Sequence, residues 1–134
     1  MALAWLLDRK DPGEAALAGE ALDIVCAEGA MVPALWFSEV ANALVLAERQ
    51  RVITAQDSSS YLSGLSIWEI VQDPVLPALS QAQVIQLSRI YKLTAYDATY
   101  LELAMRRTAT LATFDRQLAD AARAAGVRVF GDPA

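Results

Sequence analysis

The sequence predicts an α/β fold with a short, mainly parallel sheet. Short apolar segments alternate along the chain with longer segments of helical spacing, and brief turn signals separate the two kinds. Strands that alternate with helices of about ten residues or more favour parallel pairing, because a crossover between parallel strands needs such a connection. The chain has 134 residues, 55% of them hydrophobic and 20% charged, so we expect a single packed domain over residues 1–134.

Six segments show the apolar spacing of a helix. In the first of them, Leu17, Ala21 and Ile24 lie on one side, and Gly29 follows where helices commonly end. A polar run, residues 54–60, leads into the third. The predicted helices cover residues 14–28, 36–49, 55–67, 77–91, 94–107 and 116–125.

Four shorter apolar segments lie between these helices, and we interpret them as strands of the sheet. Asp73 and Pro74 close the second, and Gly126 precedes the last. The predicted strands cover residues 30–35, 68–72, 110–113 and 127–130. Because ligands of parallel sheets bind beyond the carboxyl ends of the strands, residues that follow these segments are candidates for a site.

The composition excludes several kinds of chemistry. The chain has no histidine, which rules out Ser-His-Asp and Cys-His mechanisms and histidine zinc sites. Cys26 is the single cysteine, so no internal disulfide or cysteine cluster can form, and we expect it to be a small core residue on a helix. No apolar run approaches the ~20 residues that cross a bilayer, and no signal peptide is evident. We therefore expect a cytoplasmic protein with no membrane contact.

The net charge of −5 argues against a broad surface for nucleic acid but does not exclude a local one. Basic residues do gather around the segments near residues 97 and 115, and arginine is a good bidentate partner for phosphate. A solvated helix face is the simpler explanation for any one of them. The basic residues of this group are Arg89, Lys92, Arg106, Arg107 and Arg116.

Three carboxylates, Glu39, Asp97 and Asp115, lie in apolar sequence surroundings. Acidic side chains are rarely buried unless they are paired or bound to a metal. Three such positions suggest one shared site, for which a hard divalent cation is the natural partner. Glu39 is expected in the first turn of a helix entered from a strand, with Asn42 one turn later on the same face.

Each carboxylate also has a structural interpretation. Asp115 follows a predicted strand and fits the N-cap of the next helix. Asp97 stands three residues after Thr94, a variant of the capping box. Glu39 would interact favourably with the dipole at the start of its helix. The local sequence leaves these alternatives open.

Four segments together resemble the PIN-domain nucleases, and most closely the VapC-like toxins of prokaryotic toxin–antitoxin pairs. They are Ala-Leu-Ala-Trp-Leu-Leu (2–7), Ser-Glu-Val-Ala-Asn-Ala-Leu (38–44), Leu-Thr-Ala-Tyr-Asp-Ala-Thr-Tyr-Leu-Glu-Leu-Ala (93–104) and Leu-Ala-Thr-Phe-Asp-Arg-Gln-Leu (111–118). The resemblance implies a three-layer α/β/α sandwich around a short, mainly parallel sheet. It also implies Mg²⁺- or Mn²⁺-dependent hydrolysis of RNA, a small antitoxin partner and a homodimer.

By position, Glu39, Asp97 and Asp115 match the second, third and fourth acids of that family, which are catalytic and hold the metal. Asn42 and Thr113 match its supporting polar residues. The family's first strand and first Asp precede the segment that is found here at residues 2–7, so we expect this chain to lack both. A catalytically silent PIN-like module that binds a protein or RNA is the alternative. Another carboxylate phosphohydrolase is disfavoured, because no Asp-x-Asp pair follows the first strand.

Overall fold

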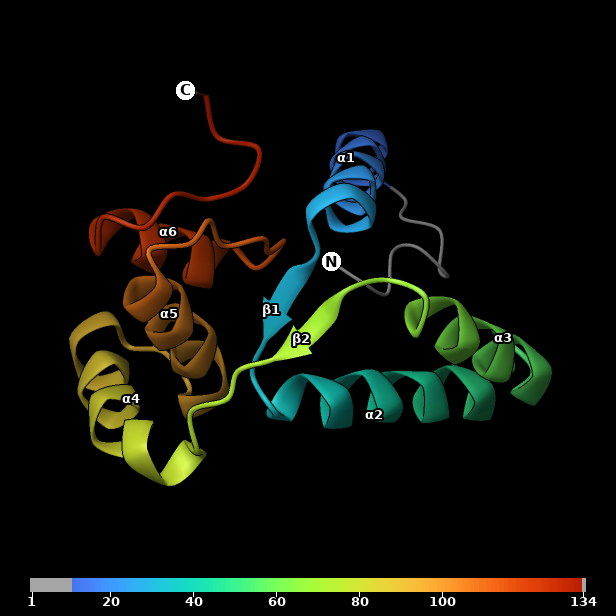
Figure 1. Ribbon diagram of the computed structural model, residues 1–134, viewed down its shortest axis with the longest axis horizontal. Helices are drawn as coiled ribbons and strands as arrows, with labels where there is room; N and C mark the ends of the chain where they lie inside the picture. Colours follow the sequence, from blue (N-terminus) through green and yellow to red (C-terminus); the bar gives the residue numbers. More distant parts are fainter. Residues whose placement is uncertain (1–10, 134) are drawn as a thin grey trace. The chain divides into compact units, whose positions relative to one another are not determined.

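The computed structural model describes residues 11–133 of the chain. The chain divides between Gln72 and Asp73 into two compact units, which we call the N-terminal unit and the C-terminal unit. The described residues form a helix-rich α/β fold with a short parallel two-stranded sheet, as the sequence predicts (Figure 1). The segment 2–7 lies outside the described residues, and a single cooperative domain stays a prediction.

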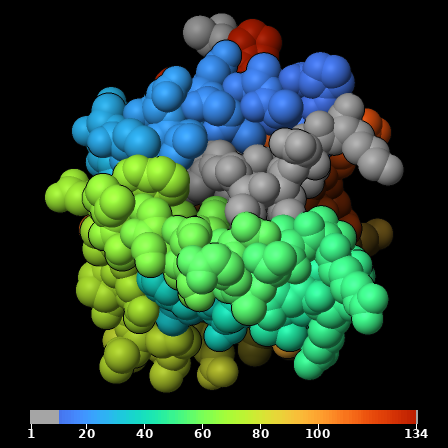
Figure 2. Space-filling model, turned by 90° about the vertical axis from the view of Figure 1, so that its right-hand side faces the viewer, coloured from blue at the N-terminus to red at the C-terminus, as the bar shows by residue number. Residues whose placement is uncertain are grey.

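The described part of the N-terminal unit, residues 11–72, contains three helices and the sheet. Strands β1 and β2 pair in parallel, with Ala30 opposite Ile70, and much of the surface visible in Figure 2 belongs to α1 and α3. A small core joins α2 and α3 through Val40, Leu44, Tyr61 and Leu65. The elements are α1 (Pro12–Glu28), β1 (Ala30–Val32), α2 (Leu35–Arg49), α3 (Ala55–Leu65) and β2 (Ile70–Gln72).

Local signals at both ends set the limits of α1. The Asp11 carboxylate accepts hydrogen bonds from the backbone N–H groups of Gly13 and Glu14, at 2.8 and 3.3 Å, which caps the helix. At the other end Gly29 has φ 80°, and a Cβ placed there would lie 2.7 Å from the carbonyl oxygen of Glu69. Glycine is therefore required where the chain turns out of the helix and into β1.

The first strand is shorter than predicted. It ends at Val32, and α2 already begins at Leu35. Pro33 follows β1 directly and has no backbone N–H to extend the ladder. Cys26 also departs from its prediction, because it is exposed on α1 and is not a core residue.

Residues 73–133 of the C-terminal unit form three helices and one parallel bridge. Its helices are α4 (Pro77–Tyr91), α5 (Ala95–Arg107) and α6 (Arg116–Ala124). Its core centres on α5, where Ala98 and Leu101 are fully buried and pack with Leu111, Leu118 and Ala122. No helix among residues 11–133 is long and apolar enough to cross a membrane.

The strands predicted at 110–113 and 127–130 are reduced to one bridge between Leu111 and Val129. Two hydrogen bonds form it, from Leu111 N–H to the Arg128 carbonyl at 2.9 Å and from Phe130 N–H to the Leu111 carbonyl at 2.8 Å. Turns at Gly126 and Gly131, both with positive φ, confine the second segment, so pairing stops after one residue.

Candidate active site

Asp97 lies in the first turn of α5, and its carboxylate takes no part in the hydrogen bonds that cap this helix. The backbone N–H of Asp97 donates to the Thr94 hydroxyl at 3.2 Å, so the threonine side chain caps the helix. The Asp97 carboxylate does not complete a capping box, and within the described residues it forms no hydrogen bond or ion pair. Its side chain is half-buried. Capping therefore accounts for Thr94 but not for the carboxylate of Asp97.

The start of α3 has the same Thr-x-x-Asp pattern as the start of α5, but its aspartate makes different hydrogen bonds. There the Thr54 hydroxyl accepts from Asp57 N–H at 3.1 Å, and the Asp57 carboxylate accepts from Thr54 N–H at 2.8 Å. These two bonds complete the capping box, and the bond from the backbone N–H of Thr54 holds the pKa of the Asp57 carboxyl below its usual value. Asp57 is thus a structural counterpart to Asp97 within the same chain.

Asp115 is the N-cap of α6, as one of its two interpretations predicts. Its Oδ1 accepts a hydrogen bond from Leu118 N–H at 2.7 Å. Its own N–H donates to the Thr113 hydroxyl at 3.1 Å, so Thr113 supports Asp115 as expected. The side chain is exposed, and Oδ2 has no hydrogen-bond partner among residues 11–133. One carboxylate oxygen therefore remains available to a ligand.

A side-chain hydrogen bond connects the beginnings of α5 and α6. Gln117, in the first turn of α6, donates from Nε2 to the carbonyl oxygen of Lys92 at 2.7 Å. Lys92 has a left-handed backbone (φ 55°) and ends α4 two residues before the N-cap of α5. The first turns that carry Asp97 and Asp115 are therefore neighbours in the C-terminal unit.

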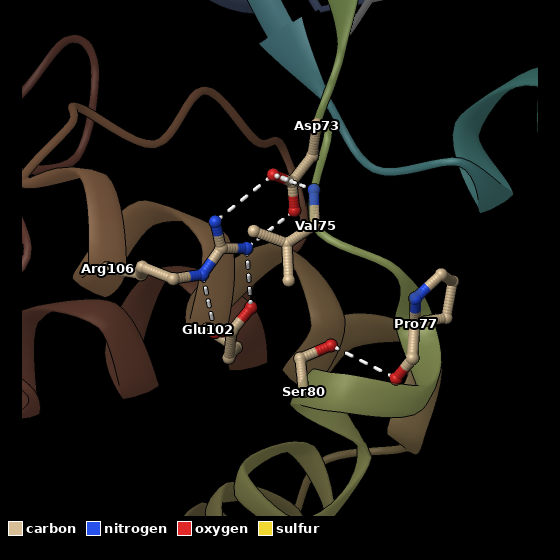
Figure 3. A network of polar contacts seen from close by, with 6 residues as sticks. All are labelled: Asp73, Val75, Pro77, Ser80, Glu102 and Arg106. Carbon is tan, nitrogen blue, oxygen red and sulfur yellow. Dashed lines mark hydrogen bonds and ion pairs between the residues drawn. The ribbon is translucent and has the colours of Figure 1, made fainter.

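Arg106 organises a second polar cluster at the other end of α5 (Figure 3). Its guanidinium binds the Asp73 carboxylate through both Nη atoms and the Glu102 carboxylate through Nε, at 2.9 Å, and Nη2, at 3.1 Å. The Asp73 and Glu102 side chains are only 9% and 10% exposed. The hydrogen bonds from Arg106 hold the pKa of the Asp73 carboxyl below its usual value.

Ion pairing divides the six acidic residues of the C-terminal unit into two groups. Arg106 holds two of them, and Arg123 holds Asp120 and Asp132 at 2.9 and 2.7 Å. The two carboxylates without an ion pair in the described part of this unit are Asp97 and Asp115. They are the two that the sequence marks as site residues.

Glu39 lies in the N-terminal unit, and its position on α2 differs from the prediction. The helix begins at Leu35 without an acidic residue in its first turn, so Glu39 is one turn further in. The helix dipole acts mainly within the first turn, so a favourable interaction with the dipole is a weaker explanation for Glu39 than the sequence suggested. Asn42 does lie one turn later on α2, and both side chains are exposed. Convergence of Glu39 with Asp97 and Asp115 stays a prediction.

The surroundings of the three carboxylates are less apolar than their sequence neighbours suggest. Glu39 and Asp115 are exposed and Asp97 is half-buried. Within the described part of either unit, no three acidic or cysteine side chains gather into a metal-binding group. Burial is therefore not the reason to assign these residues a role.

Sequence reasoning missed the Arg106 cluster. Arg106 appeared as one of five basic residues near the site, yet two carboxylates engage it. The sequence does indicate the contact of Arg106 with Glu102, because Glu102 precedes Arg106 by four positions, the spacing of a helical ion pair. Nothing local pointed to Asp73, which is 33 positions away.

The donor set suits a hard divalent cation. Mg²⁺ and Mn²⁺ prefer carboxylate oxygens and keep several water ligands, so one or two protein carboxylates suffice to anchor them. Asp97 offers two oxygens and Asp115 offers Oδ2. The residues present therefore fit such an ion.

Comparison with known protein families gives one match. The model of the PIN domain matches residues 2–124, which is most of the chain and includes all three carboxylates. The searches of curated proteins and of solved structures return no match.

Proposed function

The chain belongs to the PIN-domain family, which has a nuclease-type fold, and from this membership we propose that it is a Mg²⁺- or Mn²⁺-dependent endoribonuclease. We further propose that it is a VapC-like toxin acting in the cytoplasm. One observation carries the proposal: Asp97 and Asp115 lie on neighbouring first turns, and they are the carboxylates of the C-terminal unit that its arginines leave unpaired.

The role proposed for each residue follows from its match to an acidic or supporting position of the family. Asp97 and Asp115 hold the cation, and Glu39 completes the site or orients the attacking water, with Asn42 beside it. Thr113 fixes the backbone of Asp115 through its hydroxyl. A bound Mg²⁺ supplies two things, a lowered pKa of its water and neutralisation of charge on the phosphate.

The test of the metal site compares two aspartates in the same sequence pattern. Asp97→Asn is expected to abolish Mn²⁺ binding, measured by calorimetry on the full chain, and RNA cleavage with it. Asp57→Asn is the matched control, because Asp57 closes a capping box and should affect the stability of α3 only. Equal Mn²⁺ affinity in the wild-type protein and Asp97→Asn would refute the assignment.

Asp115 needs a design that separates its two roles. Asparagine is as good an N-cap as aspartate, so Asp115→Asn keeps the bond to Leu118 and removes the charge. Asp115→Ala removes both and should cost about 1 kcal/mol more in the free energy of unfolding. We expect both variants to lose Mn²⁺ affinity equally. If only the alanine variant loses it, Asp115 acts as a cap and not as a ligand.

The toxin assignment predicts a small protein partner. Co-expression with the product of the adjacent gene should yield a stable complex that suppresses RNA cleavage, and the free protein should be a homodimer. Separate elution of the two proteins at micromolar concentration would count against the antitoxin. RNA or partner binding without Mn²⁺-dependent turnover would instead identify a silent binding module.

A further inference from the structure

Gln117 makes a hydrogen bond that its own helix does not require. It is an exposed residue in the first turn of α6, and its Nε2 donates to the carbonyl oxygen of Lys92 at 2.7 Å, across 25 positions of the sequence. The start of α6 is already capped, because the Asp115 carboxylate accepts from Leu118 N–H. The side chain of Gln117 therefore serves a contact between elements and not the helix that carries it.

The acceptor of this bond belongs to the short link between α4 and α5. Lys92 has φ 55°, a left-handed conformation that is unfavourable for a residue with a Cβ. Such a conformation persists where the surrounding structure fixes the backbone. Leu93 follows and is buried in the core, and Thr94 is the N-cap of α5. The Lys92 carbonyl is therefore a fixed point two residues before the cap of α5.

Further hydrogen bonds lead from this contact to both candidate metal ligands. On α5, the Thr94 hydroxyl accepts from Asp97 N–H at 3.2 Å. On α6, Gln117 lies between Asp115 and Leu118, whose own hydrogen bond of 2.7 Å closes the first turn. Gln117 thus joins the turn that carries Asp115 to the segment that leads into the turn of Asp97.

Apolar packing holds the same two helices together but is less strict about their register. Ala98, next to Asp97, and Leu118, which completes the cap of Asp115, belong to one core cluster. Hydrophobic contact is non-directional, whereas a hydrogen bond is restricted in length and angle. The bond from Gln117 therefore adds a directional restraint between the two first turns.

We propose that Gln117 is a positioning residue for the candidate metal site. Its hydrogen bond sets the spacing of the Asp97 and Asp115 carboxylates, and this raises the selectivity of the site for Mg²⁺ over Ca²⁺. The inference rests on the proposed function and specifies how this chain tunes its metal site. Mg²⁺ requires a nearly octahedral shell with oxygen atoms at about 2.0–2.1 Å, whereas Ca²⁺ accepts about 2.3–2.6 Å and variable geometry. Loosening the spacing should therefore weaken Mg²⁺ binding more than Ca²⁺ binding.

The experiment measures Mg²⁺ and Ca²⁺ binding to Gln117→Met by titration calorimetry on the full chain. Methionine has a similar length and helix propensity but no N–H group to donate. Loss of a supporting contact around a metal site typically lowers affinity by about 10- to 100-fold. Because Gln117 acts through the backbone, we expect the lower end for Mg²⁺, about 10-fold, and at most about 3-fold for Ca²⁺. Both ions are divalent, so a change in local charge would alter both affinities alike.

Gln83→Met is the matched control. Gln83 is exposed on α4 in the same unit and forms no hydrogen bond among the described residues, so its variant should keep the wild-type ratio of the two affinities. Both variants should melt close to the wild-type temperature, because one exposed hydrogen bond contributes little to global stability. A changed ratio at an unchanged melting temperature separates positioning from damage to the fold.

A measurement without metal tests the contact itself. Amide hydrogen exchange of the full chain in EDTA, followed by NMR, reports the opening of each first turn. The N–H groups of Asp97 and Leu118 should exchange roughly 2- to 10-fold faster in Gln117→Met, the factor that corresponds to loss of one hydrogen bond. Gln83→Met should leave both exchange rates unchanged.

The outcomes separate this inference from the proposed function. If the wild-type protein and Gln117→Met have equal ratios of Mg²⁺ to Ca²⁺ affinity, the inference is wrong and the proposed function stands. Unchanged exchange of both amides in Gln117→Met would also overturn the inference. A wild-type protein that binds no divalent cation would instead refute the proposed function, and the positioning role would fall with it.

Discussion

Arg106→Met is the substitution whose effect the structure predicts in most detail. Methionine keeps much of the side-chain volume but leaves the Asp73 and Glu102 carboxylates, 9% and 10% exposed, without a counter-charge. Removal of one partner from a buried ion pair costs about 3–5 kcal/mol. The Arg106 side chain is itself 28% exposed, so water reaches the cluster, and we expect the lower end, about 3 kcal/mol. The corresponding fall in melting temperature is roughly 10 °C.

The cost should depend on pH in a defined direction. The pKa of Asp73 is lowered in the folded protein, so its contribution to stability is present above the unfolded-state value of about 3.9. It is lost as the pH falls through the folded-state value. In Arg106→Met, burial without a counter-charge raises the pKa of the Asp73 carboxyl. It becomes neutral as the pH falls, so the difference in stability between variant and wild type should shrink as the pH falls toward and below about 4.

The assay is urea unfolding followed by circular dichroism, with Arg107→Met as the control, since Arg107 is exposed and forms no ion pair among the described residues. All three tryptophans precede Asp73, so tryptophan fluorescence reports the N-terminal unit alone. Coincident transitions by both probes would establish one cooperative domain. A cost below about 1 kcal/mol at neutral pH, or one equal to that of Arg107→Met, would refute the reasoning.

Three further predictions concern single residues. Gly29→Ala and Gly126→Ala both place a side chain at φ 80°, but only at Gly29 would its Cβ meet the Glu69 carbonyl, at 2.7 Å. Chemical denaturation should therefore show about 1–2 kcal/mol lost at Gly126 and clearly more at Gly29. The Ser88 hydroxyl is buried without a hydrogen-bond partner in the described structure, so Ser88→Ala should unfold at the same or a higher urea concentration. Burial raises the pKa of Tyr61 to about 12. The contribution of this shift to stability is therefore complete below the unfolded-state pKa of ~10 and is lost as the pH rises through about 12. A spectroscopic titration of the tyrosines should show one group that ionises late, and Tyr61→Phe should remove it.

The sequence predicts the helices well because their signals are local. Apolar spacing and Gly29 lie within or beside α1 and place its end correctly at Glu28, whereas the helix starts two residues before the predicted range, after the Asp11 cap that the sequence analysis did not identify. The extent of the strands at 110–113 and 127–130 was harder to predict, because a strand forms only where a second segment pairs with it. Whether Leu111 pairs over one residue or four depends on turns at Gly126 and Gly131 that local propensity does not fix.

In the candidate site, too, contacts between residues close in sequence were predictable and contacts between distant residues were not. Thr113, Asp115 and Leu118 lie within six positions, and their bonds follow the expected capping pattern. The contact of Asp73 with Arg106 joins residues 33 positions apart, and no sequence pattern identified it. Exposure of Glu39 was also unpredictable from its apolar neighbours, since it depends on which side of α2 faces the core.

The two Thr-x-x-Asp turns suggest how such a site is gained or lost over evolution. In both turns the threonine hydroxyl alone satisfies the backbone N–H of the aspartate, so the helix start does not depend on where the carboxylate points. The Asp57 carboxylate turns back to its own helix start, and that of Asp97 does not. The direction of the carboxylate thus separates a stabilising cap from a group that forms no bond among the described residues. A lineage can therefore recruit or retire such an acid at little cost to the fold.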